Sequence, residues 1–322
     1  MKRFFQYSLL TVGPVVLVFC LLEATLCLLK LGTPSEGEWN SRSAGGPMVM
    51  KDPYTGLRPK PGFTSNEVTL NSFGARDNEL NTSAQKFVLC LGDSTTFGWK
   101  ISNVQAVYCN LLQDQLNAQK NLVWETVNAG VPSYTLFQGM QLFYHYLESL
   151  AEWNYVVLTF GWNENPDFDL DLAFTLKQPP VENHWLRKTY ELARRLRTFN
   201  VLESQFSESL RPNIDPFMKS QDEYVRLYRD FLRALKKRNI KPIILPVLYS
   251  AKFTRVGLIK RMKIFNRAIG IVAKEEQVLF AGELEEKFKS DPDIGWFDPY
   301  HYNEVGHRYI ANYLMKKMTK GK

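Results

Sequence analysis

Short apolar runs recur along the chain from residue 86 onward, and stretches with helical periodicity separate them. The runs cover residues 86–91, 122–128, 154–160, 241–248 and 277–281 and are rich in β-branched and aromatic residues. Continuous apolar runs of this length are typical of strands that are buried on both faces by helices. The pattern therefore predicts an α/β domain on a five-stranded parallel sheet, with ligands bound beyond the carboxyl ends of the strands.

The N-terminal segment shows a different pattern, a single long apolar stretch. Lys2 and Arg3 precede some twenty-six largely uncharged residues, which are enough to cross a bilayer as a helix. Neither a signal-peptide cleavage site nor a lipoprotein cysteine motif is evident. Residues 1–30 are therefore predicted to be an uncleaved transmembrane helix, with a cytoplasmic N-terminus and the catalytic domain on the periplasmic or extracellular side. Glu23 is expected near the outer interface, with a functional carboxylate inside the membrane as the alternative.

Composition divides the rest of the chain into a lead-in and a domain. Residues 31–85 are predicted to be a linker and a covering segment, because the first half of this stretch is rich in Gly, Ser, Pro and polar side chains. The domain is expected over residues 86–322. Residues 164–220 are too many for one crossover between strands, and they include a polar loop and a basic amphipathic helix. A substrate-binding lid, a membrane-contacting flap and a decorating subdomain all fit this insert.

The overall composition is that of a folded protein with a modest positive charge. Of 322 residues, 45% are hydrophobic and 23% are charged, and 40 Lys and Arg against 33 Asp and Glu give a net charge of +7. Much of the excess lies in residues 185–199 and in the C-terminal tail. Since no nucleic-acid-binding motif accompanies it, we expect no nucleic-acid partner.

The four cysteines are too few for a disulfide framework and lack the spacing of a metal site. Cys20 and Cys27 belong to the expected anchor. Cys90 lies in the first apolar run and Cys109 in the helix after it, and we expect both to be buried thiols. No metal ion and no organic cofactor are expected.

Polar and glycine-rich segments follow four of the predicted strands. Gly-Asp-Ser94 follows the first strand, residues 127–135 and 159–165 include the ends of the second and third, and residues 297–314 lie beyond the fifth. The carboxyl ends of parallel strands meet at one edge of a sheet, so these segments should lie close together.

Together these segments contain the groups that a serine nucleophile requires. A serine hydroxyl needs a base to remove its proton, and the base needs an acceptor on its other ring nitrogen. Asp298 and His301 supply such a pair, with the carboxylate orienting the imidazole toward Ser94. The backbone N–H of Ser94, a backbone N–H in the second loop and the side-chain amide of Asn163 are candidate donors to the oxyanion. Taken singly, Ser94 could instead be a helix cap and His301 a loop histidine.

These blocks resemble those of the SGNH, or GDSL, hydrolase family. The resemblance implies a three-layer α/β/α flavodoxin-like fold, Ser94 as nucleophile, Asp298 and His301 as the C-terminal Asp-x-x-His pair, and Gly161 with Asn163 as the Gly-x-Asn block. The upstream sequences GLRPKPG and LNSFGARD resemble the lead-in of a membrane-anchored bacterial subgroup.

The chain departs from the family pattern at two positions. Ser133 stands where the family usually has its oxyanion glycine, and Gly130 is the alternative equivalent. Glu164 replaces the aspartate of the family's Gly-x-Asn-Asp block, from which we expect an altered entrance to the site rather than lost chemistry. Asp93, Gly130, Gly161 and Glu164 are accordingly possible supporting residues. Arg76 and His307 are expected to be structural.

The sequence thus predicts a membrane-anchored serine esterase. By resemblance alone, the acyl group is expected to be small and acetyl-like, on a surface polysaccharide or a lipid. A polysaccharide O-acyltransferase and a lipid esterase of the same fold are the enzymatic alternatives. A glycan-binding or assembly component without catalytic activity is the alternative from another class.

Overall fold

The computed structural model describes residues 14, 18–28, 48–119, 121–164, 198, 216–250, 252 and 256–319. The chain divides into one unit from residues 1–43 and 177–215, and a second from residues 44–176 and 216–322. In the first unit, residues 18–28 are helical. The Glu23 carboxylate accepts hydrogen bonds from the Thr198 N–H and hydroxyl, at 2.8 and 2.6 Å.

The expected membrane anchor is described only in part. Within the described residues, no helix combines the length and the hydropathy that crossing a membrane requires. Residues 1–13, 15–17 and 29–30 lie outside the described residues, as do residues 165–197 and 199–215 of the expected insert. The anchor and the role of the insert therefore remain predictions.

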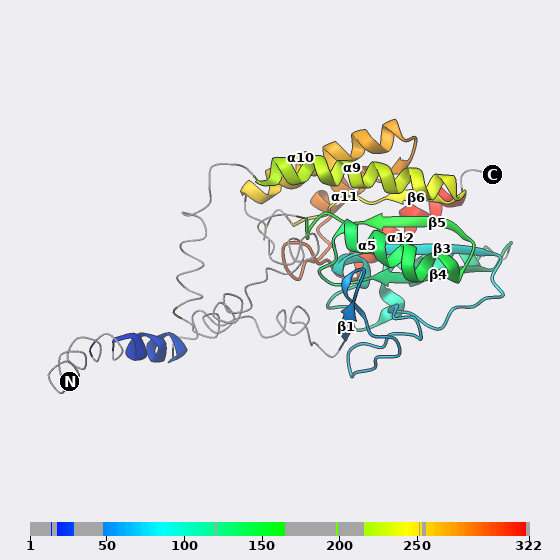
Figure 1. Cartoon of the computed structure of the whole chain (residues 1–322). Helices are drawn as coiled ribbons and strands as arrows, with labels where there is room; N and C mark the ends of the chain where they lie inside the picture. The colour runs from blue at the N-terminus through cyan, green and yellow to red at the C-terminus, as the bar shows by residue number, and fades with distance from the viewer. Residues whose placement is uncertain are drawn as a thin grey trace. The chain divides into compact units, whose positions relative to one another are not determined.

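The second unit is built on the predicted five-stranded parallel sheet (Figure 1). Its strands are β3 (Lys86–Gly92), β4 (Trp124–Gly130), β5 (Trp153–Thr159), β6 (Lys241–Ile244) and β7 (Leu279–Phe280). Their order is β4-β3-β5-β6-β7, which is the flavodoxin-like order. β6 ends earlier than the apolar run 241–248 indicates, because Pro246 has no N–H to donate to a neighbouring strand.

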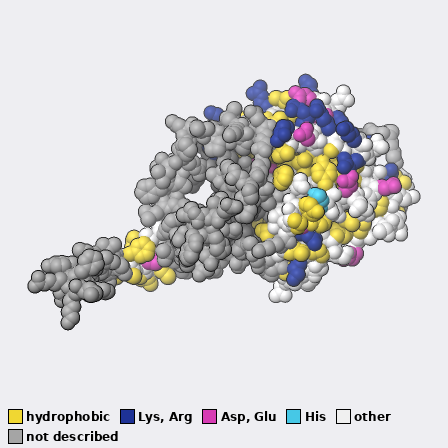
Figure 2. Space-filling view, viewed as in Figure 1, with side chains coloured by type: hydrophobic (Ala, Val, Ile, Leu, Met, Phe, Trp, Pro, Cys, Tyr) yellow, Lys and Arg dark blue, Asp and Glu magenta, His cyan; other side chains and the backbone are white. Residues whose placement is uncertain are grey.

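Helices cover both faces of the sheet, which confirms the α/β/α prediction. One face packs against α5 (Leu136–Leu142), α9 (Pro216–Lys237) and α10 (Val256–Glu275). The other packs against α4 (Tyr108–Asn117), α11 (Glu283–Ser290) and α12 (Glu304–Thr319). Short helical segments also occur at η1 (Val104–Ala106), η2 (Phe143–Leu147) and η3 (Glu148–Leu150). Lys and Arg side chains gather over the α9 and α10 side (Figure 2).

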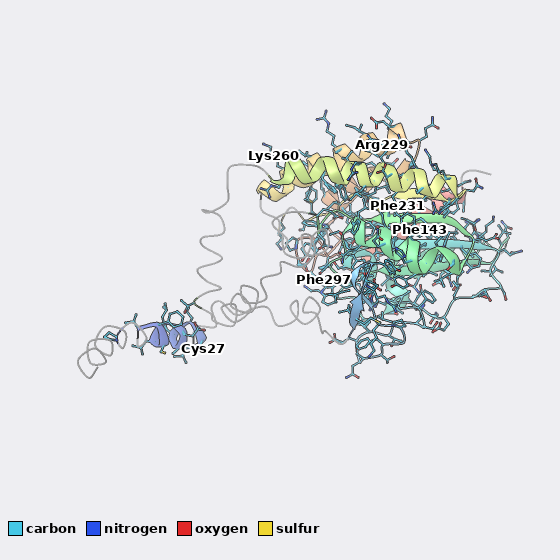
Figure 3. The ribbon with its side chains drawn as sticks, in the orientation of Figure 1. Cys27, Phe143, Arg229, Phe231, Lys260 and Phe297 are labelled. Atoms are coloured by element: carbon cyan, nitrogen blue, oxygen red, sulfur yellow. A yellow bond between two sulfur atoms is a disulfide. The ribbon has the colours of Figure 1, made fainter. Side chains whose placement is uncertain are left out.

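Residues of β3 alternate between the two cores, as the two-residue period of a strand requires. Leu89 and Leu91 pack with the first set of helices, whereas Val88 and Cys90 pack with the second. In the first core, the rings of Phe143 and Phe231 meet edge to face with their centroids 5.6 Å apart (Figure 3). Burial on both faces explains why β3 reads as a continuous apolar run.

The lead-in forms structure where the sequence indicated a linker and a covering segment. β1 (Val49–Asp52) and β2 (Gly56–Pro59) form an antiparallel hairpin. Tyr134 donates its hydroxyl hydrogen to the Leu57 carbonyl at 2.6 Å, and Gln138 donates to the Thr55 carbonyl at 3.0 Å. The hairpin therefore covers the loop after β4 and the start of α5.

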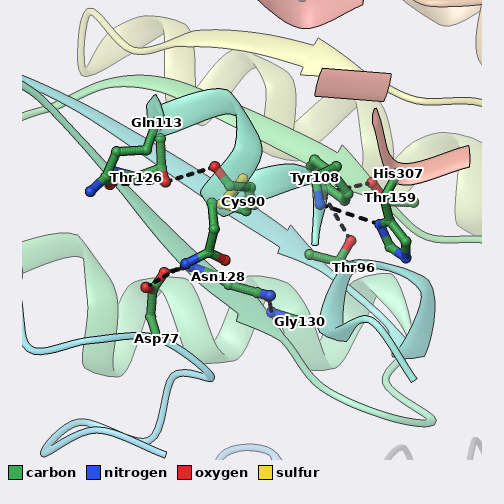
Figure 4. The surroundings of a disulfide bond; sticks show 12 residues. Asp77, Cys90, Thr96, Tyr108, Gln113, Thr126, Asn128, Gly130, Thr159 and His307 are labelled. Carbon is green, nitrogen blue, oxygen red and sulfur yellow. Dashed lines mark hydrogen bonds between the residues drawn. A yellow bond between two sulfur atoms is a disulfide. The ribbon is translucent and has the colours of Figure 1, made fainter. Parts of the chain in front are cut away.

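The expectation of two buried thiols was wrong, because Cys90 and Cys109 form a disulfide (Figure 4). Both residues are fully buried. Cys90 points from β3 toward the face on which α4 packs, and this packing brings the two Cα atoms to 6.3 Å. The separation of 19 residues along the chain carried no signal of this contact.

Candidate active site

The nucleophile candidate lies at the first turn of a helix that begins where β3 ends. α3 (Ser94–Phe97) has Asp93 as its N-cap, and Asp93 Oδ1 accepts from Thr95 N at 2.8 Å and from the Thr95 hydroxyl at 2.7 Å. The capping residue is thus Asp93, and Ser94 remains available for another role. Burial raises the pKa of Asp93 to about 6. Among the described residues, the Ser94 N–H has no acceptor.

Ser94, His301 and Asp298 are joined by a continuous chain of hydrogen bonds. His301 Nε2 lies 2.8 Å from Ser94 Oγ, and His301 Nδ1 lies 2.7 Å from Asp298 Oδ2. The other carboxylate oxygen, Asp298 Oδ1, accepts from the backbone N–H groups of Tyr300 and His301 at 3.1 and 2.9 Å. Burial acts to raise the pKa of Asp298, but hydrogen bonds and the charge of His301 outweigh it and hold that pKa well below its usual value.

Lys100 is a member of this group that the sequence analysis missed. Its ammonium donates to Asp298 Oδ2 at 3.0 Å, the same oxygen that faces His301. The Lys100 side chain is 44% exposed, so solvent weakens the pair. Because Lys100 and Asp298 lie 198 positions apart, no local pattern could have revealed the contact.

The second loop presents Ser133 in the conformation that glycine favours. Tyr134 N donates to the Val131 carbonyl at 3.1 Å, which closes a turn in which Ser133 has φ +68°. The Ser133 N–H has no acceptor in the part of the chain that the structure describes. Asn163 Nδ2 donates to the Tyr134 carbonyl at 2.9 Å, so the third loop is held against this turn. Of the two candidates, Ser133 thus combines a glycine-like backbone conformation with a backbone N–H that has no acceptor among the described residues.

Gly130 has a different role, which is to let α3 approach the sheet. Its N–H donates to Asn128 Oδ1 at 3.1 Å and is therefore already used. A Cβ at Gly130 would lie 2.2 Å from Phe97 N and 2.6 Å from the Thr96 carbonyl carbon. The missing side chain is what allows the helix that carries Ser94 to sit directly against β4.

The third loop is fixed by Gly161 and Glu164. Gly161 has φ +144°, and a Cβ there would lie 2.3 Å from Val247. Glu164 Oε1 accepts from Leu136 N at the first residue of α5, so it joins the third loop to the second. Burial raises the pKa of Glu164 to about 8, which leaves this group mainly protonated at pH 7.

Arg76 has the structural role that we expected. Arg76 is 4% exposed, and its guanidinium donates to the carbonyls of Phe97, Gly98 and Ile101 at 2.9, 2.7 and 2.5 Å. Carbonyls at a helix C-terminus attract a cation. Arg76 thereby ties the lead-in to the segment that follows Ser94.

The two other described histidines, His145 and His307, take no part in this chain of hydrogen bonds. His307 is buried, accepts from Tyr108 N at 3.3 Å, and has its pKa lowered to about 3 by burial. His145 stacks on Tyr54 with ring centroids 3.5 Å apart. His184 lies outside the described residues. Over the residues that the structure does describe, no cluster of His, Cys, Asp and Glu could hold a metal ion.

Comparison with known proteins identifies one family and several similar structures. The model of the GDSL-like lipase/acylhydrolase family matches residues 90–309, which include Ser94, Asn163, Asp298 and His301. One similar structure is a point mutant of Axe2, an acetyl-xylooligosaccharide esterase from Geobacillus stearothermophilus. It is 16% identical to this chain with a TM-score of 0.50, and the match covers 73% of this chain and 95% of that one. An acetyl xylan esterase, AlAXEase, is 15% identical with a TM-score of 0.47, over 72% of this chain and 98% of that one. No curated protein sequence matches.

Proposed function

The chain belongs to the GDSL-like lipase/acylhydrolase family of serine ester hydrolases, and on this premise we propose that Ser94, His301 and Asp298 form its catalytic triad. The observation that carries the proposal is the hydrogen-bond chain from the Ser94 hydroxyl through both nitrogens of His301 to the Asp298 carboxylate. The Ser94–His301 distance lies within the range for proton transfer from a nucleophile to its base, and the His301–Asp298 distance is that of a hydrogen bond that orients the imidazole.

In the proposed reaction, Ser94 Oγ attacks the ester carbonyl carbon while His301 Nε2 accepts the hydroxyl proton. The resulting imidazolium is stabilised by Asp298 and returns the proton to the leaving alcohol, which leaves an acyl group on Ser94. A water molecule, deprotonated by His301, then releases the acid and restores the serine. The negative oxygen of each tetrahedral intermediate would be stabilised by the N–H groups of Ser94 and Ser133 and by the amide of Asn163.

We further propose that the acyl group is small. Trp162 and Tyr300 lie beside Asn163 and His301 in the sequence, and their rings pack with centroids 4.8 Å apart. Both side chains are largely buried, at 3% and 8% exposure. Bulky buried rings next in sequence to Asn163 and His301 favour a small, acetyl-like acyl group over a long one.

The proposed location is a membrane-anchored domain outside the cytoplasm, acting on acyl esters of a surface polysaccharide. Support for the anchor comes from the long uncharged stretch after Lys2 and Arg3. Support for the compartment comes from the disulfide between Cys90 and Cys109, because disulfides persist in oxidising environments and are rare in the cytosol.

Labelling with a fluorophosphonate probe tests the nucleophile directly. We expect the wild-type chain and Ser290→Ala, a change at an exposed serine on α11, to label equally, and Ser94→Ala not to label. Among p-nitrophenyl esters, kcat/KM should fall as the acyl chain lengthens from acetate to octanoate. Labelling that persists in Ser94→Ala would place the nucleophile elsewhere. A folded wild-type protein that neither labels nor hydrolyses acetate esters would instead support a binding protein without catalytic activity.

A further inference from the structure

The outward face of α10 alternates cations with exposed aliphatic side chains. Apart from Glu275, which pairs with Arg229 at the end of the helix, its exposed members are Lys260, Lys263, Ile264, Arg267, Ile271 and Lys274. At about 100° per residue, these six positions fall within one stripe about 100° wide along the helix. The opposite side of α10, including Met262, Phe265 and Ile269, is buried in the domain core. We call the six exposed residues the α10 stripe.

The cations of the α10 stripe differ from those of the neighbouring helix. On α9, Arg229 pairs with Glu275 at 2.8 Å, and Arg233 and Lys236 pair with Glu276 at 2.8 and 3.0 Å. The four cations of the α10 stripe make no such ion pair with any described residue. Lys263 interacts electrostatically with Glu285 and Glu286 on α11. Within the described residues, the charges of Lys260, Arg267 and Lys274 are therefore the ones available to an external partner. Figure 3 labels Lys260, on α10, and Arg229, on α9.

Two isoleucines interrupt the cations at regular intervals. Ile264 is 38% exposed and Ile271 is 52% exposed, and they lie seven residues apart on the same face. Exposed aliphatic residues between cations suit a lipid surface, where the cations contact headgroup phosphates and the aliphatic groups reach the boundary with the acyl chains. An acidic polysaccharide would bind the cations as a lipid surface does, but it would offer no apolar surface for the isoleucines to contact.

We propose that the α10 stripe is a contact site for an anionic lipid bilayer, which holds the domain flat against a membrane. The proposal goes beyond the esterase function and does not rest on the catalytic residues. Each cation near an anionic surface strengthens binding about fivefold. Replacing three of the four cations should therefore weaken the contact by about two orders of magnitude.

The test places an environment-sensitive fluorophore on the full-length chain in lipid vesicles. In a Cys20→Ser, Cys27→Ser background, the dye is attached through Ile271→Cys on the α10 stripe. A second protein carries the dye through Ser290→Cys, an exposed position on the opposite face of the sheet. The vesicles contain phosphatidylcholine alone or with phosphatidylglycerol, so the anchor's own insertion is the same in both.

We expect a blue shift at position 271 only with phosphatidylglycerol, reversed by high salt, and no shift at position 290. In the Lys260→Gln, Arg267→Gln, Lys274→Gln variant, the ratio of membrane-bound to unbound domain, read from the dye at position 271, should fall about 100-fold. Its melting temperature and its acetate-ester hydrolysis in detergent should stay unchanged. Equal signals in the two lipids, or equal signals at the two positions, would overturn the proposal. A shift at position 271 with soluble polygalacturonate but not with vesicles would overturn it in favour of an acidic polysaccharide.

Discussion

Adding one methyl group at Gly130 should disable the enzyme without touching any catalytic side chain. In Gly130→Ala, the new Cβ would meet Phe97 N at 2.2 Å and the Thr96 carbonyl carbon at 2.6 Å, which are backbone atoms of α3. Backbone atoms cannot rotate away as a flexible side chain can. To reach a contact above about 3 Å, α3 must move by about 1 Å relative to β4.

The movement would be transmitted to the nucleophile, because α3 has only four residues and Ser94 is the first of them. Ser94 Oγ now lies 2.8 Å from His301 Nε2, so a shift of this size breaks the hydrogen bond or bends it. A misplacement of about 1 Å costs on the order of 100-fold in rate. Overpacking should also lower the free energy of unfolding by about 1–3 kcal/mol.

Steady-state hydrolysis of p-nitrophenyl acetate, measured well below the melting temperature, separates the two effects. Gly270→Ala is the matched control, since a Cβ there meets Phe280 at 3.4 Å and lies inside the regular helix α10. We expect this control to keep the wild-type kcat and to gain about 0.5–1 kcal/mol in stability. A folded Gly130→Ala protein with the wild-type kcat would refute the argument that this contact seats the nucleophile.

Three further outcomes follow from the geometry. Ser133→Gly should raise the free energy of unfolding, measured in urea, by up to about 1 kcal/mol, because glycine adopts φ +68° without strain. Its kcat should change little, since the backbone N–H remains. A large loss of kcat would show that the Ser133 hydroxyl has a role in the reaction. Replacing Cys90 and Cys109 together by alanine should cost about 3 kcal/mol, and adding a reductant to this variant should change its melting temperature no further. Asp298→Asn should lower kcat by about 10⁴-fold at pH 7. Because folding lowers the pKa of Asp298, this carboxylate stabilises the folded state above about pH 4, and the stabilisation is lost as the pH falls. The free energy of unfolding should therefore fall less steeply with decreasing pH in Asp298→Asn than in the wild type. Equal steepness would contradict the lowered pKa of Asp298.

Much of the fold could be predicted from the sequence because its signals are local. Each buried strand is a short apolar run that helical stretches interrupt, and burial on both faces makes such runs distinctive. The catalytic candidates could be found in the same way, because Gly-Asp-Ser94 and the Asp298 and His301 pair lie at the ends of predicted elements, where parallel strands bring loops together.

Contacts between distant segments could not be predicted, because they depend on how the elements pack against one another. The bond between Cys90 and Cys109 exists because α4 lies on the face of the sheet to which Cys90 points. The contact of Lys100 with Asp298 exists because the turn after α3 and the C-terminal loop meet at one edge. The hydrophobic periodicity of the segments that carry these residues gives no information about either contact.

By itself, then, the sequence determined which residues form the strands and which polar groups stand at their ends, because the periods of strands and helices are properties of the local chain. Tertiary structure alone decided that Ser133 adopts the left-handed conformation, that Gly130 admits α3, and that Glu164 joins two loops. These roles arise from atoms that meet only when the sheet and its helices pack, at distances of a few ångströms that no local pattern specifies.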